Sequence, residues 1–365
     1  MAGRFAGWVV RLLLAVGLAA SNPLAAAAAS AECRAGGSLV ETIDRVAAEP
    51  ARWTCTPARQ SLSDERAFLR FTVERGEEVP RYFEARRAAL QAIHLRVTSR
   101  SGEVRSASYS PAELQQSRLG GYFRVPLPRT DSPPREVIAA IDLPTHAMTL
   151  EQAHLAAADA HHGVDEHRLL LLLAALCGML LMPLMFNTAF YRILREPFVL
   201  WHSALAVTLL LTIVVSSGLA FDVLAALPVM AISGLSTLVF GLSVGAAGMF
   251  SSTFIEPGKL DPRLRRALPV AAFWAALASI LHATMPFVLR PWQSSLYYLA
   301  FVPVLIVYLA ALIDALRKGS RAARFQAVGW TPLVVVCLIR LVSGLAPSIP
   351  NSDAMLLFYA GCVIE

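Results

Sequence analysis

The chain has 365 residues, of which 56% are hydrophobic and only 16% are charged, and its formal net charge is +6. This composition excludes an intrinsically disordered protein and is typical of a chain that crosses a membrane several times. Most of the Lys and Arg residues in the second half lie in short loops between apolar stretches. Because such loops orient membrane proteins, the charge indicates topology, and we expect no nucleic acid partner.

The first 31 residues have the pattern of a secretory signal peptide. Arg4 and Arg11 precede an apolar run over residues 12–20, and the segment ends in the small residues 29–31. We expect cleavage after Ala31, with an uncleaved N-terminal anchor as the alternative. In either case the residues that follow are exported.

Residues 32–145 have the pattern of a β domain. Short segments rich in β-branched and aromatic residues are separated by Gly, Ser and Pro, which predicts a small antiparallel β-sandwich. The predicted strands cover residues 68–73, 93–98, 122–127 and 137–143. A helix over residues 81–92 fits the pattern as an excursion from that sheet.

Cys33 and Cys55 are the only cysteines in the exported part. An even number of cysteines in an oxidising compartment predicts a disulfide between them. Cys177, Cys337 and Cys362 fall inside apolar stretches, where a thiol behaves as a small apolar group. Their spacing matches no metal site, so we expect no metal and no cofactor.

Residues 146–167 are predicted to be a juxtamembrane linker. The linker contains five of the eight histidines: His146, His154, His161, His162 and His167. Because imidazole binds metals and titrates near neutral pH, a metal or proton sensor is one interpretation. The alternative, which we favour, is a solvated linker without a site.

From residue 168 onward, six apolar stretches and the start of a seventh are each separated by a short loop. The six approach or exceed the ~20 residues that cross a bilayer. They cover residues 169–186, 198–219, 223–250, 267–289, 296–315 and 325–345. This predicts a seven-helix transmembrane bundle and, with the sandwich, an α+β multidomain membrane protein.

The positive charges of the loops alternate along this region. The loops after the first, third and fifth spans are rich in Lys and Arg, whereas the intervening loops offer only Arg290. Short basic loops stay in the cytoplasm, so the sandwich is predicted to lie on the outer side of the membrane.

Polar residues within spans are costly and often face a partner or a cavity. His202, His282 and Arg340 are therefore our candidates for intramembrane polar contacts. Gly241 and Gly245 form a small-xxx-small pair on the third span, which lets helices approach closely. Packing within the bundle is the favoured interpretation of this pair, and a dimer face is the alternative.

A signal peptide, an exported β domain and seven spans together resemble the bacterial seven-transmembrane receptors with diverse intracellular signalling modules. Residues 68–143 look like the family's jelly-roll sensor domain, and the sequence from Leu169 onward looks like its membrane module. Phe186 and Asn187, followed by Arg192 and Arg195, are similar to the family's first inner loop.

The resemblance implies a sensory receptor of a bacterial inner membrane, with a periplasmic sandwich, that works as a homodimer. It would bind an external small molecule, such as a carbohydrate, and signal to a cytoplasmic output module, with the diguanylate cyclase (GGDEF) type the closest. The seventh span begins near Ala354 and the sequence stops at Glu365. Twelve residues reach about 18 Å into a core of ~30 Å, so we expect a truncated chain whose output module is missing.

Two other classes of function compete with the receptor. A transporter or channel with an accessory periplasmic domain is the first, although no repeat of broken helices supports it. A membrane enzyme that uses His282, Arg340 and the juxtamembrane histidines at the outer face is the second. The sequence contains no P-loop, no Gly-x-Gly-x-x-Gly and no His-Glu-x-x-His, so we expect no catalytic residues in this chain.

Overall fold

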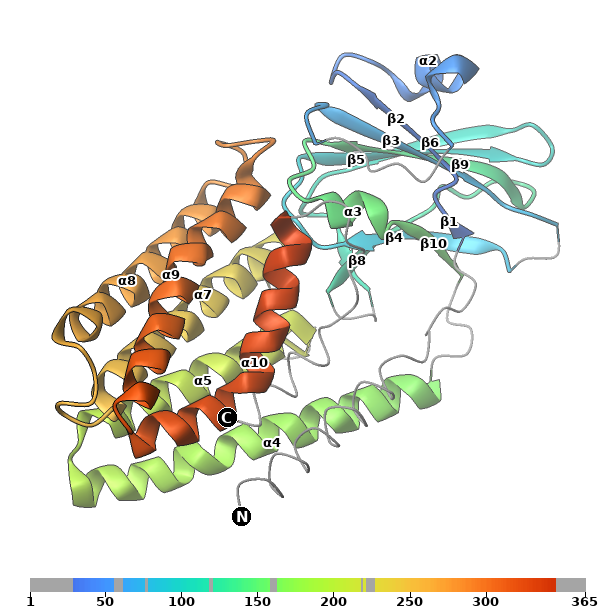
Figure 1. Cartoon of the computed structure of the whole chain (residues 1–365). Helices are drawn as coiled ribbons and strands as arrows, with labels where there is room; N and C mark the ends of the chain where they lie inside the picture. Colours follow the sequence, from blue (N-terminus) through green and yellow to red (C-terminus); the bar gives the residue numbers. More distant parts are fainter. Residues whose placement is uncertain are drawn as a thin grey trace.

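A β domain stands on one end of a bundle of long helices in the computed structural model (Figure 1). The structure describes residues 29–55, 62–75, 78–117, 121–157, 163–217, 219–220 and 227–345. Most of the predicted signal peptide and the whole predicted seventh span lie outside these residues. Ala29 and Ser30 are described, and they form the edge strand β1.

In the residues that the structure describes, the β domain consists of two five-stranded sheets in which every neighbouring pair is antiparallel. The first sheet has the order β1 (Ala29–Ser30), β10 (His154–Ala157), β4 (Pro80–Arg86), β8 (Tyr122–Pro126) and β7 (Gln115–Gln116). The second has the order β2 (Cys33–Gly37), β3 (Arg66–Thr72), β9 (Pro134–Asp142), β5 (Ala92–Ser99) and β6 (Val104–Tyr109).

The two sheets pack on one shared hydrophobic core. Strand β5 shows why: Ile93, Leu95 and Val97 are buried, and the residues between them are partly exposed. Phe71 and Phe83, on opposite sheets, meet edge to face with ring centroids 5.9 Å apart. Each such side chain contributes roughly 2 kcal/mol through burial. The predicted β domain is therefore confirmed, while its jelly-roll topology stays a prediction.

The helix predicted over residues 81–92 is wrong, because residues 80–86 form strand β4 between β8 and β10. Phe83 and Ala85 are fully buried in the shared core. Glu84 and Arg86 alternate with these apolar residues, as in a strand, but Ala, Glu and Arg are also good helix formers. Tertiary burial overrides the helical preference of this Ala- and Arg-rich segment.

Most of residues 146–167, which were predicted to be a linker, instead belong to or border helices and a strand. They include helix α3 (Ala147–Glu151), strand β10 and the start of helix α4 (Gly163–Leu194). Leu150 and Leu155 belong to the sandwich core. The sandwich therefore extends to Ala157, and the part of the linker over residues 158–162 lies outside the described residues.

Cys33 and Cys55 are joined by a disulfide in the structure. The loop that it closes contains helix α2 (Ile43–Ala47) and the short 3-10 helix η1 (Pro50–Arg52). Val46 of α2 packs on Phe68 and Ala140, on the outer face of the second sheet. The disulfide thus anchors the first segment of the domain.

Six long helices follow in the described part of the chain. They are α4, α5 (Pro197–Ser217), α7 (Val229–Phe254), α8 (Pro262–Thr284), α9 (Gln293–Arg317) and α10 (Arg321–Leu345). The first five are long and apolar enough to cross a membrane. Large apolar side chains such as Ile193, Phe273 and Ile306 are exposed on their outer surface. Hydrocarbon is the solvent that suits such a surface.

Helices α7 and α8 approach each other closely because α7 carries small residues. A Cβ atom on Gly241 would lie 2.9 Å from the Ala275 carbonyl oxygen, and one on Gly245 would lie 3.2 Å from that of Ala272. The small-xxx-small pair is therefore used for packing inside the bundle.

We predict that Gly241→Ala lowers the stability of the bundle by about 2 kcal/mol, because the added methyl group collides with the backbone of α8. Gly178 of α4 is the matched control, since a Cβ atom there would have no neighbour within 4 Å. Thermal unfolding in detergent should show a lowered midpoint for Gly241→Ala only. Equal midpoints for the two variants would contradict the packing of α7 on α8.

Candidate functional site at the sandwich–bundle junction

Arg290 joins the two parts of the molecule. It lies in the loop between α8 and α9, and its guanidinium group donates to three backbone carbonyl groups of the β domain. Nε donates to Pro144 O at 3.0 Å, and Nη2 donates to Leu62 O at 2.6 Å and to Asp64 O. Charged donors on neutral carbonyl groups make strong hydrogen bonds. The only basic residue in the predicted outer loops is thus used for docking.

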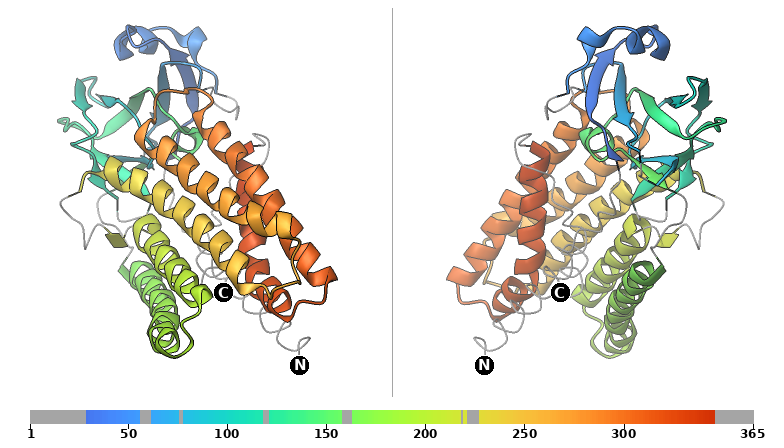
Figure 2. Two further views of the ribbon diagram at one scale, coloured as in Figure 1. Left: turned by 90° about the vertical axis from the view of Figure 1, so that its left-hand side faces the viewer. Right: turned by 90° about the vertical axis from the view of Figure 1, so that its right-hand side faces the viewer.

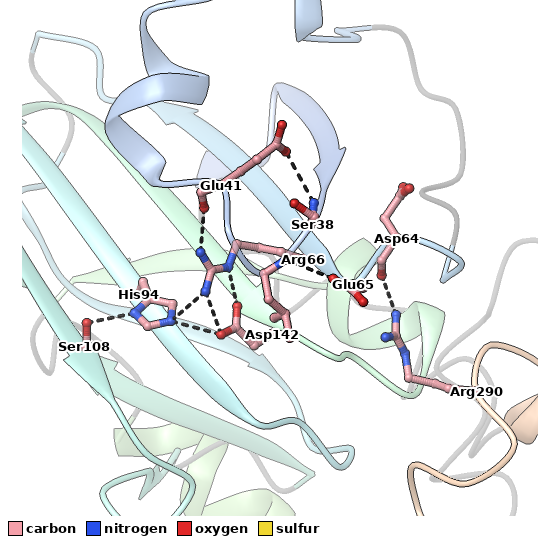
Figure 3. A network of polar contacts seen from close by, with 10 residues as sticks. Ser38, Glu41, Asp64, Glu65, Arg66, His94, Ser108, Asp142 and Arg290 are labelled. Atoms are coloured by element: carbon pink, nitrogen blue, oxygen red, sulfur yellow. Dashed lines mark hydrogen bonds and ion pairs between the residues drawn. The ribbon is translucent and has the colours of Figure 1, made fainter.

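The chain continues from this contact directly into an ion-pair cluster (Figure 3). Arg66, two residues after Asp64, holds the Asp142 carboxylate with two hydrogen bonds of 2.5 and 2.8 Å. His94 lies 3.1 Å from the same carboxylate and 2.8 Å from Ser108. Burial opposes the ionisation of Asp142, but the hydrogen bonds from Arg66 and His94 outweigh it and lower its pKa. The cluster fixes the start of β3, which is next to the residues that Arg290 contacts.

A second contact lies on the other side of the junction. Arg87 follows β4, and its Nη2 donates to Val215 O near the C-terminal end of α5 at 3.1 Å. A guanidinium group at a helix C-terminus also interacts favourably with the helix dipole. The views in Figure 2 agree that the sandwich rests on this end of the helices.

A cavity of about 320 Å³ lies between these contacts. Arg86, Arg87, His146, Met148 and Thr149 of the sandwich line one end of it. The remainder is lined by α5, α7, α8, α9 and α10, with aromatic rings and hydroxyl groups. A concave, mainly apolar site with a few polar groups is the usual form of a small-molecule pocket.

The two predicted intramembrane histidines do not come together. His282 lines the cavity, and its ring lies on that of Tyr297 with centroids 4.4 Å apart. His202 instead pairs with Asn187 at 2.8 Å between α4 and α5. Of these two residues, only His282 therefore belongs to the candidate site. Arg340, the third predicted residue, is in α10, and its side chain lies outside the described part of the structure.

The histidines of the predicted linker have separate roles. Nδ1 of His146 accepts from the Met148 amide and caps α3, and its ring lies 6.4 Å from that of Tyr298 of α9. His154 pairs with the buried Glu84 at 3.5 Å. Among the residues that the structure describes, no group of three or more His, Cys, Asp or Glu residues could hold a metal ion. His161 and His162 are outside them, as is the side chain of His167.

The opposite end of the bundle has a polar network of its own. The Glu256 carboxylate, in the loop after α7, accepts from the Ser320 hydroxyl group and from the amides of Arg321 and Ala322, both at 3.1 Å. The hydrogen bond from Ser320 contributes most to lowering the pKa of Glu256, to about 2. A carboxylate at a helix N-terminus is favourable, so this contact ties α7 to α10.

A β domain docked on helices of membrane length defines a multi-pass membrane protein with a separate β domain. The family model described as 7TM diverse intracellular signalling matches residues 169–365. The match covers more than half of the 365 residues, so the chain belongs to this family. Members of this family are membrane receptors for signal transduction. No curated protein and no solved structure matches the chain.

We predict that Arg290→Ala loosens the docking by about 2 to 3 kcal/mol, because three carbonyl groups lose a charged donor. Limited proteolysis should then cleave near residues 62–64 faster than in the unchanged protein. Arg266→Ala, an exposed arginine at the other end of α8, is the control and should cleave at the original rate. Unchanged cleavage in Arg290→Ala would show that the guanidinium group does not hold the junction.

His154 should make the stability of the sandwich depend on pH. Burial disfavours the charged ring, but the hydrogen bonds to Glu84 and to the Gln152 carbonyl, together with the negative charge of Glu84, outweigh burial and raise the pKa of His154 above 6.5. The stabilisation is therefore complete below pH 6.5 and is lost as the pH rises through the raised pKa.

The free energy of unfolding, measured between about pH 5.5 and about pH 8.5, should show this loss. Both His154→Gln and Glu84→Gln should flatten its dependence on pH. A profile that is steep in all three proteins would assign the titration to another group.

Proposed function

We propose that this chain is a sensory receptor of a bacterial inner membrane. The β domain faces the periplasm, a small external molecule is the stimulus, and the helices pass the signal to a cytoplasmic output module. The output that the family resemblance implies is a diguanylate cyclase, and the working unit is a homodimer. We assign no catalytic role to the described residues.

One observation carries the proposal: the cavity is formed jointly by the sandwich and the bundle. A molecule bound there contacts α3 of the β domain and helices α7 and α9 at once. Its affinity must therefore depend on how the sandwich is docked. A ligand shifts a conformational equilibrium by its difference in affinity for the two states, and a joint site supplies such a difference.

The distribution of charge supports the orientation. Arg290, at the sandwich end, is occupied by docking. The loops and helix ends at the other end carry ten Lys and Arg residues, which favours that end as cytoplasmic. These residues are Arg192, Arg195, Lys259, Arg263, Arg265, Arg266, Arg317, Lys318, Arg321 and Arg324.

The network at the proposed cytoplasmic end suggests how the signal leaves the bundle. Arg265, in the first turn of α8, donates to the carbonyl groups of Ser252, Ile255 and Glu256 at 2.6 to 3.0 Å. Glu256 in turn caps α10. A shift of α7 around a ligand would therefore move the start of α10 with it.

A fluorophore on Lys259→Cys tests this coupling in a chain whose other free cysteines are replaced by alanine. Lys259 is exposed at the far end, next to Lys318. Releasing the sandwich with Arg290→Ala should change the emission of the fluorophore in lipid nanodiscs, because the two ends are coupled. Arg266→Ala again serves as the control for loss of a surface charge.

Identical emission with and without Arg290 would contradict the receptor. So would accumulation of small polar solutes by sealed proteoliposomes that contain the protein, because solute flux is the property of a transporter or channel.

A further inference from the structure

The part of the cavity wall that the bundle supplies indicates the chemistry of the ligand, and this inference rests on the receptor function proposed above. Among the described residues of the lining, helices α5, α7, α8, α9 and α10 contribute no Asp, Glu, Lys or Arg. A charged group placed among these helices would find no counter-charge from them in a medium of low dielectric constant, which is costly. The wall therefore favours an uncharged ligand.

The hydroxyl groups of this wall already donate to backbone carbonyl groups. Thr212 donates to Thr208 O at 2.7 Å, and Ser243 donates to Val239 O at 2.9 Å. Tyr308 of α9 donates to Val244 O of α7 at 2.6 Å. Because these protons are committed within the bundle, the wall offers a ligand mainly apolar and aromatic surface.

Aromatic rings form a continuous row along the cavity. The centroid of the His282 ring lies 4.4 Å from that of Tyr297, which in turn lies 5.1 Å from that of Phe301. Phe240 of α7 continues the row, with its centroid 5.5 Å from that of Phe301. All four rings line the cavity. Aromatic rings pack favourably in tilted and edge-to-face arrangements, so the row suits a ligand with an aromatic body.

The sandwich end of the cavity contains a hydroxyl group that needs a partner. The Thr149 side chain is 1% exposed, and its hydroxyl group has no hydrogen-bond partner among the described residues, although Thr149 lines the cavity. A buried hydroxyl without a partner is costly unless a ligand or water satisfies it. One hydroxyl or carbonyl group on the ligand would satisfy it.

The two arginines at the sandwich end are engaged by the protein itself. Arg86 donates to Gln152 Oε1 at 3.4 Å, and Arg87 donates to Val215 O at 3.1 Å. Glu151 of the short helix α3 is acidic, and a carboxylate disfavours an anion near it. The arginines therefore do not require an anionic ligand.

We propose that the cavity binds an uncharged, mainly aromatic molecule of one or two rings that carries one hydroxyl or carbonyl group. The polar group meets Thr149, and the rings lie against Tyr297, Phe301 and Phe240. An apolar cavity of ~150 Å³ holds one benzene ring, so a cavity of about 320 Å³ has room for two fused rings. 2-Naphthol has this size and one polar group.

The test measures binding to the full chain in lipid nanodiscs by equilibrium dialysis. Protein-free nanodiscs correct for partition of the probe into lipid. 2-Naphthol should bind saturably, and naphthalene, which lacks the hydroxyl group, should bind about fivefold more weakly. 2-Naphthoate has the same rings and a negative charge, and it should bind about tenfold more weakly than 2-naphthol.

Two variants locate the probe in the cavity. Thr149→Val keeps the shape of the side chain and removes its hydroxyl group, so it should weaken 2-naphthol about fivefold and should not weaken naphthalene. Ser236→Leu fills the cavity from α7 and should weaken both probes about tenfold. Thr72→Val is the matched control, since Thr72 is exposed at the end of β3 and outside the lining.

Absence of saturable 2-naphthol binding would overturn the assignment, and so would a 2-naphthoate affinity equal to that of 2-naphthol. Equal losses of 2-naphthol affinity in Thr149→Val and Thr72→Val would also overturn it. These results are distinct from failure of the receptor function. Binding as described, with identical emission of the Lys259→Cys fluorophore with and without Arg290, would leave the site in place and contradict the receptor. A coupled fluorophore in a protein that binds none of the three probes would refute the site alone.

Discussion

The docking of Arg290 on three backbone carbonyl groups is the contact on which the rest of the account depends. An arginine in a loop between two membrane helices is ordinarily free to reach the headgroups. Here its guanidinium group is committed to Leu62, Asp64 and Pro144, which border strands β3 and β9. Arg66 at the start of β3 and Asp142 at the end of β9 form a bidentate ion pair. The bundle is therefore attached to a rigid part of the sandwich. Together with the Arg87 contact and the apolar core that continues into α5 and α7, this attachment makes the cavity a joint site.

Packing within the bundle varies from one helix pair to another. Gly241 and Gly245 bring α7 against α8, and Tyr308 of α9 donates to Val244 O at 2.6 Å, so one side of α7 is tightly held. Val244 and Tyr308 also line the cavity, and other lining residues belong to the sandwich and α10. A helix that is tight on one side and borders a cavity on another can respond to a ligand without losing its packing. Glu256, just beyond the end of α7, is well placed to report such a response to α10.

Much of this architecture follows from strong sequence patterns. Apolar stretches of about twenty residues identified the five candidate spans, and alternation identified β5. Strand β4 was missed because its Ala, Glu and Arg residues also favour a helix, and only contact with β8 and β10 decides its conformation. A lone arginine in a charge-poor loop was a sequence signal that Arg290 has a role. Its carbonyl partners could not be predicted, because they are more than 140 positions away in the sequence. No sequence signal predicted the cavity, because Arg86, His146 and Tyr297 are brought together only when the sandwich docks on the bundle.

The distance between the two parts in lipid tests this account most directly. Spin labels on Val104 of β6 and Ile313 of α9, both exposed, would report it by double electron–electron resonance. A sandwich held by Arg290 and Arg87 should give one narrow distance distribution. A broad or multi-peaked distribution in the unchanged protein would mean that the sandwich moves independently of the bundle, and the joint cavity could not then be the site at which the signal begins.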